Sequence, residues 1–332
     1  MKSVNCPLCD GKAELHIEKK VRTFRKEDFH IFEYYYKCSS CNEDFTTTEL
    51  DEINVNQVYN QYREKYSIPF PQQLKDARAK YNVTAAKMSD ILGLGTNQYR
   101  LYEDGEIPSL SSGTLLNLIM NSKEFKKIVQ SKQELIKNSG KILEHLDELI
   151  GQENTFTIDH KQLFFSPSKN PNRFNGFTIP SFEKFANMAL YYIVNAPFKV
   201  RLNKFLFYAD FTNYKYSGFS ISGCQYAALP MGSVPNNYSM LFGILESDNY
   251  LTTELVTIKE KENEKLVPVK TFNSELFSKQ ELNILAQVLK KFKSLSTPEI
   301  MKIAHDEKAW LDNIKNKSII DFSIYAPQII AL

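Results

Sequence analysis

The sequence is poor in the residues that mark open or fibrous architectures. Its 332 residues include only 12 glycines and one tryptophan, and 41 basic residues nearly balance 39 acidic ones, for a net charge of +2. The scarcity of glycine excludes collagen-like repeats and glycine-rich linkers, and the charge balance excludes a polybasic tail. The hydrophobic fraction of 42% is ordinary for folded domains, and the length predicts roughly two or three of them.

Long hydrophobic runs are absent as well. The longest unbroken run is Met188–Val194, whereas a membrane-spanning helix needs about 20 apolar residues. Residues 1–5 show no apolar secretory region. We therefore expect a cytoplasmic protein without a membrane partner, in which clustered cysteines bind metal more often than they form disulfides.

Four of the five cysteines lie within the first 41 residues, as two C-x-x-C pairs. Each pair forms a tight turn that directs two thiolates to one point, and two pairs supply the tetrahedral sulfur set of structural zinc. We expect Gly11 to adopt a positive φ after the first pair. The alternative is a redox pair, and Cys224 is expected to be a buried apolar residue. The pattern predicts one structural Zn²⁺ per chain, bound by Cys6, Cys9, Cys38 and Cys41.

The periodicity of apolar residues predicts the main elements. Alternation within 14–36 predicts strands, and 57–65 predicts a short helix. A long amphipathic helix is expected over 124–149, with Gly140 as a candidate interruption. A section with β-branched residues at 217–270 precedes two helices that begin near Ser278 and Thr297.

Residues 72–105 have the layout of a DNA-reading helix-turn-helix. Helices are expected at 72–80, at 85–92 after an N-cap at Thr84, and from a cap at Thr96 to Tyr102, with the turn at 93–95. Tyr99 and Tyr102 would then face inward, leaving polar side chains at the end that enters a major groove. Asparagine and glutamine pair with adenine, and arginine with guanine. The predicted DNA contacts are Thr84, Lys87, Thr96, Asn97, Gln98 and Arg100.

Local charge favours this interpretation. Residues 71–100 contain five basic and two acidic residues, which leaves +3, and such cations contact phosphates without reading sequence. The alternative is a helical hairpin that only packs. Arg78 and Glu103 are expected to form a buried structural pair that ties the first helix to the end of the third.

The first 130 residues resemble the MqsA antitoxin family. The resemblance rests on the cysteine quartet, on Thr23-Phe24-Arg25, on the linking helix and on residues 92–105, Leu-Gly-Leu-Gly-Thr-Asn-Gln-Tyr-Arg-Leu-Tyr-Glu-Asp-Gly. It implies a homodimer that represses its own operon at a palindromic operator, with Asn97 reading a base. Leu101 stands where the family has an arginine, which leaves open whether Arg100 takes that role.

The C-terminal part resembles the Panacea, or SocA-like, antitoxin domain. The matching segments are 199–210, 221–235 and 304–310, in that order. The resemblance implies a mainly helical domain with a small β-element that neutralises a toxin by direct contact, while one branch of the family hands its toxin to a protease. The toxin-contacting residues are expected among Lys204, Tyr208, Asp210, Tyr226, Met231, His305 and Trp310.

Enzymatic chemistry is the less favoured interpretation. His305 and Glu307 could serve acid–base chemistry, yet no Ser/His/Asp order, phosphate loop or further metal-ligand cluster accompanies them. His305 and Trp310 are also explained as a structural pair at a helix junction, and Lys204 as a side chain that reaches solvent. We therefore expect no catalytic residues.

The combined prediction is a multidomain, mainly α protein. It comprises a small β-rich zinc module at 1–66, a five-helix-type Cro/XRE helix-turn-helix domain with an extended helix at 67–150, a linker at 151–178 and a Panacea domain at 179–332. The expected function is that of an antitoxin that neutralises a neighbouring toxin and autorepresses its operon. The alternatives are a transcriptional regulator with a ligand- or partner-sensing C-terminal domain and a protease adaptor.

Overall fold

The chain divides into two compact units. The computed structural model describes residues 4–154, 161, 165–258 and 260–332. The first unit combines Met1–Val58 with His160–Leu332, and the second is Tyr59–Asp159. The described residues are mainly helical, as predicted, with a small antiparallel sheet near the N-terminus. None of the helices described is long and apolar enough to cross a membrane.

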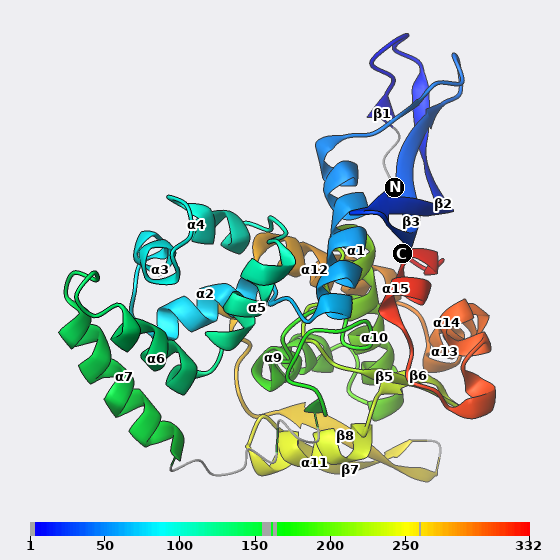
Figure 1. Cartoon of the computed structure of the whole chain (residues 1–332). Coiled ribbons are helices and arrows are strands. Elements are labelled where there is room, and N and C mark those ends of the chain that lie inside the picture. The colour runs from blue at the N-terminus through cyan, green and yellow to red at the C-terminus, as the bar shows by residue number, and fades with distance from the viewer. Residues whose placement is uncertain (1–3, 155–160, 162–164, 259) are drawn as a thin grey trace. The chain divides into compact units, whose positions relative to one another are not determined.

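A long β-hairpin dominates the N-terminal part of the first unit (Figure 1). Strands β1 (Val4–Asn5), β2 (Lys12–Phe24), β3 (Glu27–Cys38) and β4 (Asp44–Phe45) form one antiparallel sheet in chain order. Phe24 pairs with Glu27, so that Arg25 and Lys26 form a two-residue turn with φ of 50° and 68°. Two left-handed residues match the twist of paired strands, which explains the hairpin's tight end.

Helix α1 (Thr48–Tyr66) begins nine residues before the helix predicted at 57–65. Its acidic first turn and basic last turn complement the helix dipole. Two of its amides pair with the backbone of β3. Gln57 accepts from the N–H of Phe32 at 2.9 Å and donates to its C=O at 2.7 Å. Asn54 does the same with Tyr34, at 2.8 and 2.9 Å. The helix thereby covers backbone groups that an edge strand would leave open.

The second unit is helical. It contains the end of α1 followed by α2 (Pro71–Lys80), α3 (Ala85–Leu92), α4 (Gln98–Glu103), α5 (Leu110–Leu118), α6 (Ser122–Ser131) and α7 (Ser139–Asn154). The long helix predicted over 124–149 is wrong, because α6 and α7 are separate. The break lies before Gly140, at turns that end with Asn138 in the left-handed conformation at φ 63°. Lys132 directly follows α6, and its ammonium group donates to the Ile91 carbonyl near the end of α3.

The C-terminal part of the first unit surrounds helix α10. Its elements are α9 (Phe182–Ile193), α10 (Lys199–Ser217), β5 (Tyr226–Leu229), β6 (Gly232–Pro235), α11 (Tyr238–Ser247), β7 (Leu251–Ile258), β8 (Lys261–Pro268), η1 (Ser274–Leu276), α12 (Lys279–Phe292), α13 (Thr297–Asp306), α14 (Lys308–Leu311), η2 (Ile314–Asn316), α15 (Phe322–Tyr325) and η3 (Ala326–Gln328). Every residue from Leu202 to Lys215 is buried, so α10 is the centre of this part. The helices predicted near Ser278 and Thr297 are confirmed as α12 and α13.

The described part of the predicted linker at 151–178 is not a free connector. Phe165, Asn175 and Phe177 are buried, and the ring of Phe165 contacts those of Phe182 and Phe185 in α9. Its second half therefore folds with the C-terminal part. Of the short ordered piece predicted at 163–165, residues 163 and 164 lie outside the described residues.

Candidate functional sites

The four N-terminal cysteines meet at one point. Their sulfur atoms all lie within 4.8 Å of one another, with 3.7 Å between Cys6 and Cys41 and 3.5 Å between Cys9 and Cys38. Four sulfurs held tetrahedrally at the Zn–S distance of about 2.3 Å would be separated by about 3.8 Å. The arrangement could therefore hold a metal ion of this kind.

The two C-x-x-C turns have the same construction. The backbone N–H groups of Leu8 and Ser40 each donate to the sulfur two residues before them, at 3.4 Å. The N–H donors of Cys41 and Ser40 lower the pKa of Cys38 to about 6. Such donors favour the thiolate, which is the form that binds metal.

The positive φ expected at Gly11 lies one residue earlier. Asp10 adopts φ 56°, and Asn42 adopts φ 63° at the equivalent place in the second turn. Gly11 has a different reason to be glycine: a Cβ there would lie 2.5 Å from Oγ of Ser40 and 3.1 Å from Sγ of Cys38. The two turns approach so closely that this position has no room for a side chain.

Helices α2, α3 and α4 form a tightly bonded group. Tyr99 and Tyr102 of α4 are buried, as predicted. The Tyr99 hydroxyl donates to the Leu74 carbonyl in α2 at 2.9 Å, and its N–H donates to Oγ of Ser89 in α3 at 3.1 Å. Gly93 ends α3 in the left-handed conformation at φ 69°. These contacts set the position of α4 relative to the two preceding helices.

The residues predicted to contact DNA lie around the starts of α3 and α4. Thr84 caps α3 by accepting from the Lys87 N–H. The N-cap of α4 is Asn97, not the predicted Thr96, and the Asn97 side chain makes no capping hydrogen bond. Thr84, Thr96, Asn97 and Arg100 are exposed, whereas Lys87 and Gln98 are half-buried. Two acids neighbour this set, since Gln98 donates to Glu106 and Arg100 lies 3.9 Å from Asp104.

Asp210 is a buried centre of hydrogen bonds in the C-terminal part. One carboxylate oxygen accepts the N–H groups of Ile221 and Ser222, both at 2.8 Å, and the other accepts the hydroxyls of Ser222 at 2.6 Å and Tyr226 at 2.7 Å. Burial raises the pKa of Asp210, while these donors oppose the rise. The carboxylate fixes the loop that follows α10 against β5.

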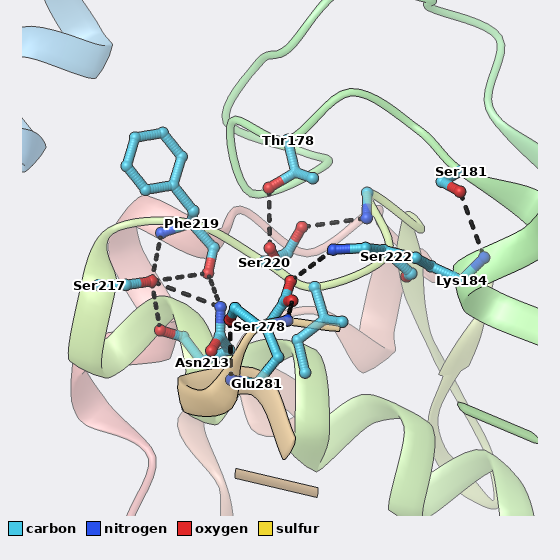
Figure 2. Close-up of polar contacts among 12 residues, drawn as sticks. Thr178, Ser181, Lys184, Asn213, Ser217, Phe219, Ser220, Ser222, Ser278 and Glu281 are labelled. Carbon is cyan, nitrogen blue, oxygen red and sulfur yellow. Dashed lines mark hydrogen bonds and ion pairs between the residues drawn. The ribbon is translucent and has the colours of Figure 1, made fainter. Parts of the chain in front are cut away.

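Further hydroxyl and amide groups hold the same loop (Figure 2). Asn213 donates to the Phe219 carbonyl at 2.9 Å, and Thr178 donates to the Ser220 carbonyl at 2.9 Å. The Ser217 hydroxyl donates to the Asn213 carbonyl at 2.7 Å. Figure 2 shows these groups directed toward the loop backbone. The network therefore stabilises a turn of the fold.

The structure buries four of the seven residues predicted to contact a toxin. Lys204, Tyr208, Asp210 and Tyr226 are each at most 1% exposed. Lys204 does not reach solvent; its ammonium group donates to the Ser233 carbonyl at 3.0 Å, and burial lowers its pKa to about 7. Tyr208 donates to Glu307 at 3.3 Å. These side chains support the fold and present no surface to a partner in this structure.

The other three residues lie close together near the surface. Met231, in the turn between β5 and β6, is 49% exposed. Trp310 donates through Nε1 to the Leu229 carbonyl at 2.8 Å, and its ring stacks on His305 at 4.1 Å. Leu311 beside it is also exposed. We call Met231, His305, Trp310 and Leu311 the turn patch.

Two buried charged residues have contacts that the sequence did not predict: Lys215, which was given no role, and Glu307, which was considered only for acid–base chemistry. They bind residues 329–332, and no local pattern could reveal this, because the partners lie 23 or more positions apart in the chain. The amides Asn54 and Gln57 were missed as well, although their spacing on one helical face was a usable signal.

Comparison with known families identifies the C-terminal part. Residues 202–311, about a third of the chain, match the family described as Antitoxin SocA-like, Panacea domain. The match extends from α10 to α14 and includes the Asp210 centre and the turn patch. No curated protein matches the chain. Residues 202–311 are therefore similar to the SocA-like Panacea domain, and this similarity supports an antitoxin role.

Proposed function

We propose that this chain is an antitoxin that binds and silences a toxin through its C-terminal part and represses its own operon through α2–α4. The match of residues 202–311 to the SocA-like Panacea domain carries the proposal. The toxin is the product of an adjacent gene. Occlusion or distortion of the toxin's active site would account for neutralisation.

The toxin-binding surface is assigned to the turn patch. Met231 and Leu311 are exposed apolar side chains beside an amphipathic tryptophan, and residues of this kind anchor protein interfaces. The carbonyls of Leu229 and Ser233, on either side of Met231, accept hydrogen bonds from Trp310 at 2.8 Å and from Lys204 at 3.0 Å, so both ends of this turn are held.

Co-expression with the adjacent gene tests this assignment. The wild-type chain should rescue growth and co-purify with the toxin, whereas Met231→Asp should weaken both. Met240, which is similarly exposed in α11, provides the control Met240→Asp. Equal rescue by the two variants would exclude the turn patch, and no rescue by wild type would exclude the antitoxin function. Loss of rescue in a protease-null strain would indicate a protease adaptor.

The DNA-binding half is proposed from α3 and α4. The exposed Asn97 and Arg100 side chains beside the start of α4 support it, because asparagine and arginine read bases in the major groove. Two copies of the chain would read a palindromic operator. Glu106 and Asp104 beside the set limit its positive charge, so we expect few phosphate contacts and a shallow dependence of affinity on salt.

Anisotropy titrations with DNA from upstream of the chain's own gene test this half. Asn97→Ala and Arg100→Ala should each weaken binding by roughly tenfold, since a good base contact is worth about 1–3 kcal/mol. Lys137→Ala, an exposed change outside the set, should bind as wild type does. Equal affinity of all variants would exclude base reading by α4.

Zinc and catalysis complete the proposal. The quartet of cysteines is proposed to hold one structural Zn²⁺, because four sulfur ligands leave no open coordination position for substrate.

His305 is proposed to have a structural role in its stack with Trp310. We expect His305→Phe, which keeps a ring for stacking, to retain toxin neutralisation. A loss of neutralisation in this variant, with the fold intact and the toxin still bound, would favour chemistry at His305 instead.

A further inference from the structure

The hairpin of β7 and β8 lies at the edge of the C-terminal part (Figure 1). Its base is buried, since Leu251 and Leu266 are each 1% exposed. No described side chain from Thr252 to Lys265 is buried, and Leu255 is 71% exposed. A two-stranded hairpin alone is only marginally stable in water, and further strands stabilise it. The outer part of this hairpin would therefore be stabilised by a third strand.

The pairing of the two strands determines which backbone groups point away from the hairpin. The Leu266 N–H donates to the Pro197 carbonyl at 2.7 Å, outside the hairpin. Leu266 and Thr253, which lies opposite, therefore exchange no hydrogen bonds with each other. Such pairs alternate along an antiparallel ladder, so the N–H and C=O groups of Thr253, Leu255 and Thr257 point outward from β7. Within the part of the chain that the structure describes, these backbone groups have no hydrogen-bond partner.

The corresponding edge of β8 is protected. Its outward N–H at Leu266 is already used by Pro197. The next two outward positions toward the turn carry Glu264 and Glu262, and Glu264 pairs with Lys199 at 2.6 Å. Charged side chains commonly protect an edge strand from further pairing. The outward positions of β7 are two threonines and a leucine, so the edge of β7 is the open one in this hairpin.

The open edge is complementary to a second copy of itself. Antiparallel pairing of two β7 strands centred on Leu255 places Leu255 opposite Leu255 and Thr253 opposite Thr257. Each outward residue then exchanges both backbone hydrogen bonds with its partner, and threonine pairs are favourable across strands. On the other face Glu254 lies opposite Val256, so that like charges are not opposed. A register shifted by two residues would instead oppose the two copies of Glu254.

We propose that the edge of β7 pairs with β7 of a second copy of this chain and joins the two hairpins into one antiparallel sheet. The two-fold axis passes beside Leu255, whose apolar side chains meet on one face of that sheet. The contact belongs to the first unit and uses none of α2–α4. It is independent of the proposed function, because neither toxin nor DNA takes part in it.

Engineered cysteines test the register in the full chain. Opposite residues that exchange no hydrogen bonds lie about 4.5 Å apart at Cα, within the range of about 4.4–6.8 Å that a disulfide requires. Glu254→Cys and Val256→Cys, mixed and oxidised with copper–phenanthroline, should therefore form a disulfide-linked dimer with one copy of each. Neither variant alone should cross-link, since a residue and its own copy would be roughly 8 Å apart at Cα.

A second mixture provides the control. Ile258→Cys, exposed on the same strand, should not cross-link with Val256→Cys, because four residues along the strand separate these positions in the proposed register. Wild type treated in the same way measures cross-linking through its own cysteines, of which Cys9 and Cys41 are exposed. Absence of the disulfide between residues 254 and 256, or equal yields from the two mixtures, would overturn the proposal.

Leu255→Pro separates edge pairing from other effects. The proline removes an outward N–H and no hydrogen bond between β7 and β8, so we expect an unchanged circular dichroism spectrum and melting temperature. Added to both cysteine variants, it should abolish their mixed disulfide, and cross-linking that persists would contradict pairing through this edge. If the cysteine mixture fails to cross-link while Leu255→Pro weakens rescue from the toxin, the edge pairs with the toxin and the second copy is excluded.

Discussion

Nε of Arg78 in α2 lies 2.6 Å from Oε1 of Glu103 at the end of α4. The Arg78 guanidinium also donates to the Val83 carbonyl, between α2 and α3, at 3.5 Å. The predicted Arg–Glu contact between the first and third helices is therefore confirmed, although only Glu103 is buried and Arg78 is half-buried. Because Glu103 is only 5% exposed, one arginine both joins the helices and neutralises a carboxylate that water does not reach.

Removal of Arg78 should destabilise the second unit. Arg78→Met leaves the Glu103 carboxylate buried without its charged donor, and we expect the free energy of unfolding to fall by roughly 1–3 kcal/mol. Chemical denaturation followed by circular dichroism measures the change. The double variant Arg78→Met/Glu103→Leu should recover part of the loss, because an apolar pair tolerates burial better than a single charge. A single variant as stable as wild type would show that solvent already satisfies Glu103.

Elements with local start and stop signals could be predicted from the sequence. Helix α3 occupies the predicted residues 85–92 because Thr84 caps its first turn and Gly93 ends it, and both signals lie within the helix's immediate neighbourhood. The start of α12 also carries a local signal, since Ser278 and Glu281 form a capping box there. The spacing of the cysteines predicted that Cys6, Cys9, Cys38 and Cys41 come together, because each C-x-x-C turn is formed by residues close in the chain.

Features that depend on distant contacts could not be predicted. Lys204 is charged in sequence and buried in the structure, because β6 supplies the Ser233 carbonyl 29 positions later. The amphipathic pattern over 124–149 continues through the turn between α6 and α7, since Ile136 is still buried there. Periodicity reports which residues face a core, and it does not report where the chain changes direction.

The pairing of Gln57 with Phe32 should contribute measurably to stability. Gln57→Leu leaves the N–H and C=O of Phe32 without these partners, and an unsatisfied buried polar group costs about 1–3 kcal/mol. We expect a lower melting temperature and faster hydrogen exchange at the Phe32 amide. Val55→Ala, an exposed change on the same helix, should alter stability by no more than about 0.5 kcal/mol. Unchanged exchange at Phe32 in the leucine variant would contradict the role of this pair.

Lys204 should make stability depend on pH. Burial lowers its pKa from an ordinary value of 10.5 to about 7. Between these values the unfolded chain holds a proton that the folded chain has released, so this group makes stability rise with pH. Below pH 7 both states are protonated, and the cost of the buried charge is fully present. His305 responds as well, since burial and then the Lys204 charge lower its pKa.

Comparison of wild type with the variant Lys204→Met isolates the contribution of the Lys204 ammonium group to the pH dependence of stability. The advantage of the variant over wild type, measured as the difference in free energy of unfolding, should be largest below pH 7. It should shrink by at most about 1.4 kcal/mol per pH unit as the pH rises toward 10. Denaturant titrations of both proteins at several pH values provide the measurement. A difference that stays constant from pH 7 to 10 would mean that folded Lys204 keeps an ordinary pKa.

Gly11→Ala should disrupt the cysteine site although no cysteine is changed. The added Cβ would lie 2.5 Å from Oγ and 2.7 Å from Cβ of Ser40, so the two turns must separate. We expect reduced zinc content by elemental analysis and a lower melting temperature. The control Gly95→Ala, whose Cβ would meet nothing within 4 Å, should keep the zinc content of wild type, as should Cys224→Ala.

The second-site variant decides why Gly11→Ala fails. If steric conflict with Ser40 is the cause, Gly11→Ala/Ser40→Gly should recover zinc, because the substitution removes both close atoms of the opposite turn. Residual contact with Sγ of Cys38 at 3.1 Å should keep this recovery incomplete. A double variant that binds no more zinc than Gly11→Ala would place the cause in backbone conformation instead. Since the left-handed residue is Asp10 and not Gly11, the structure favours the steric cause.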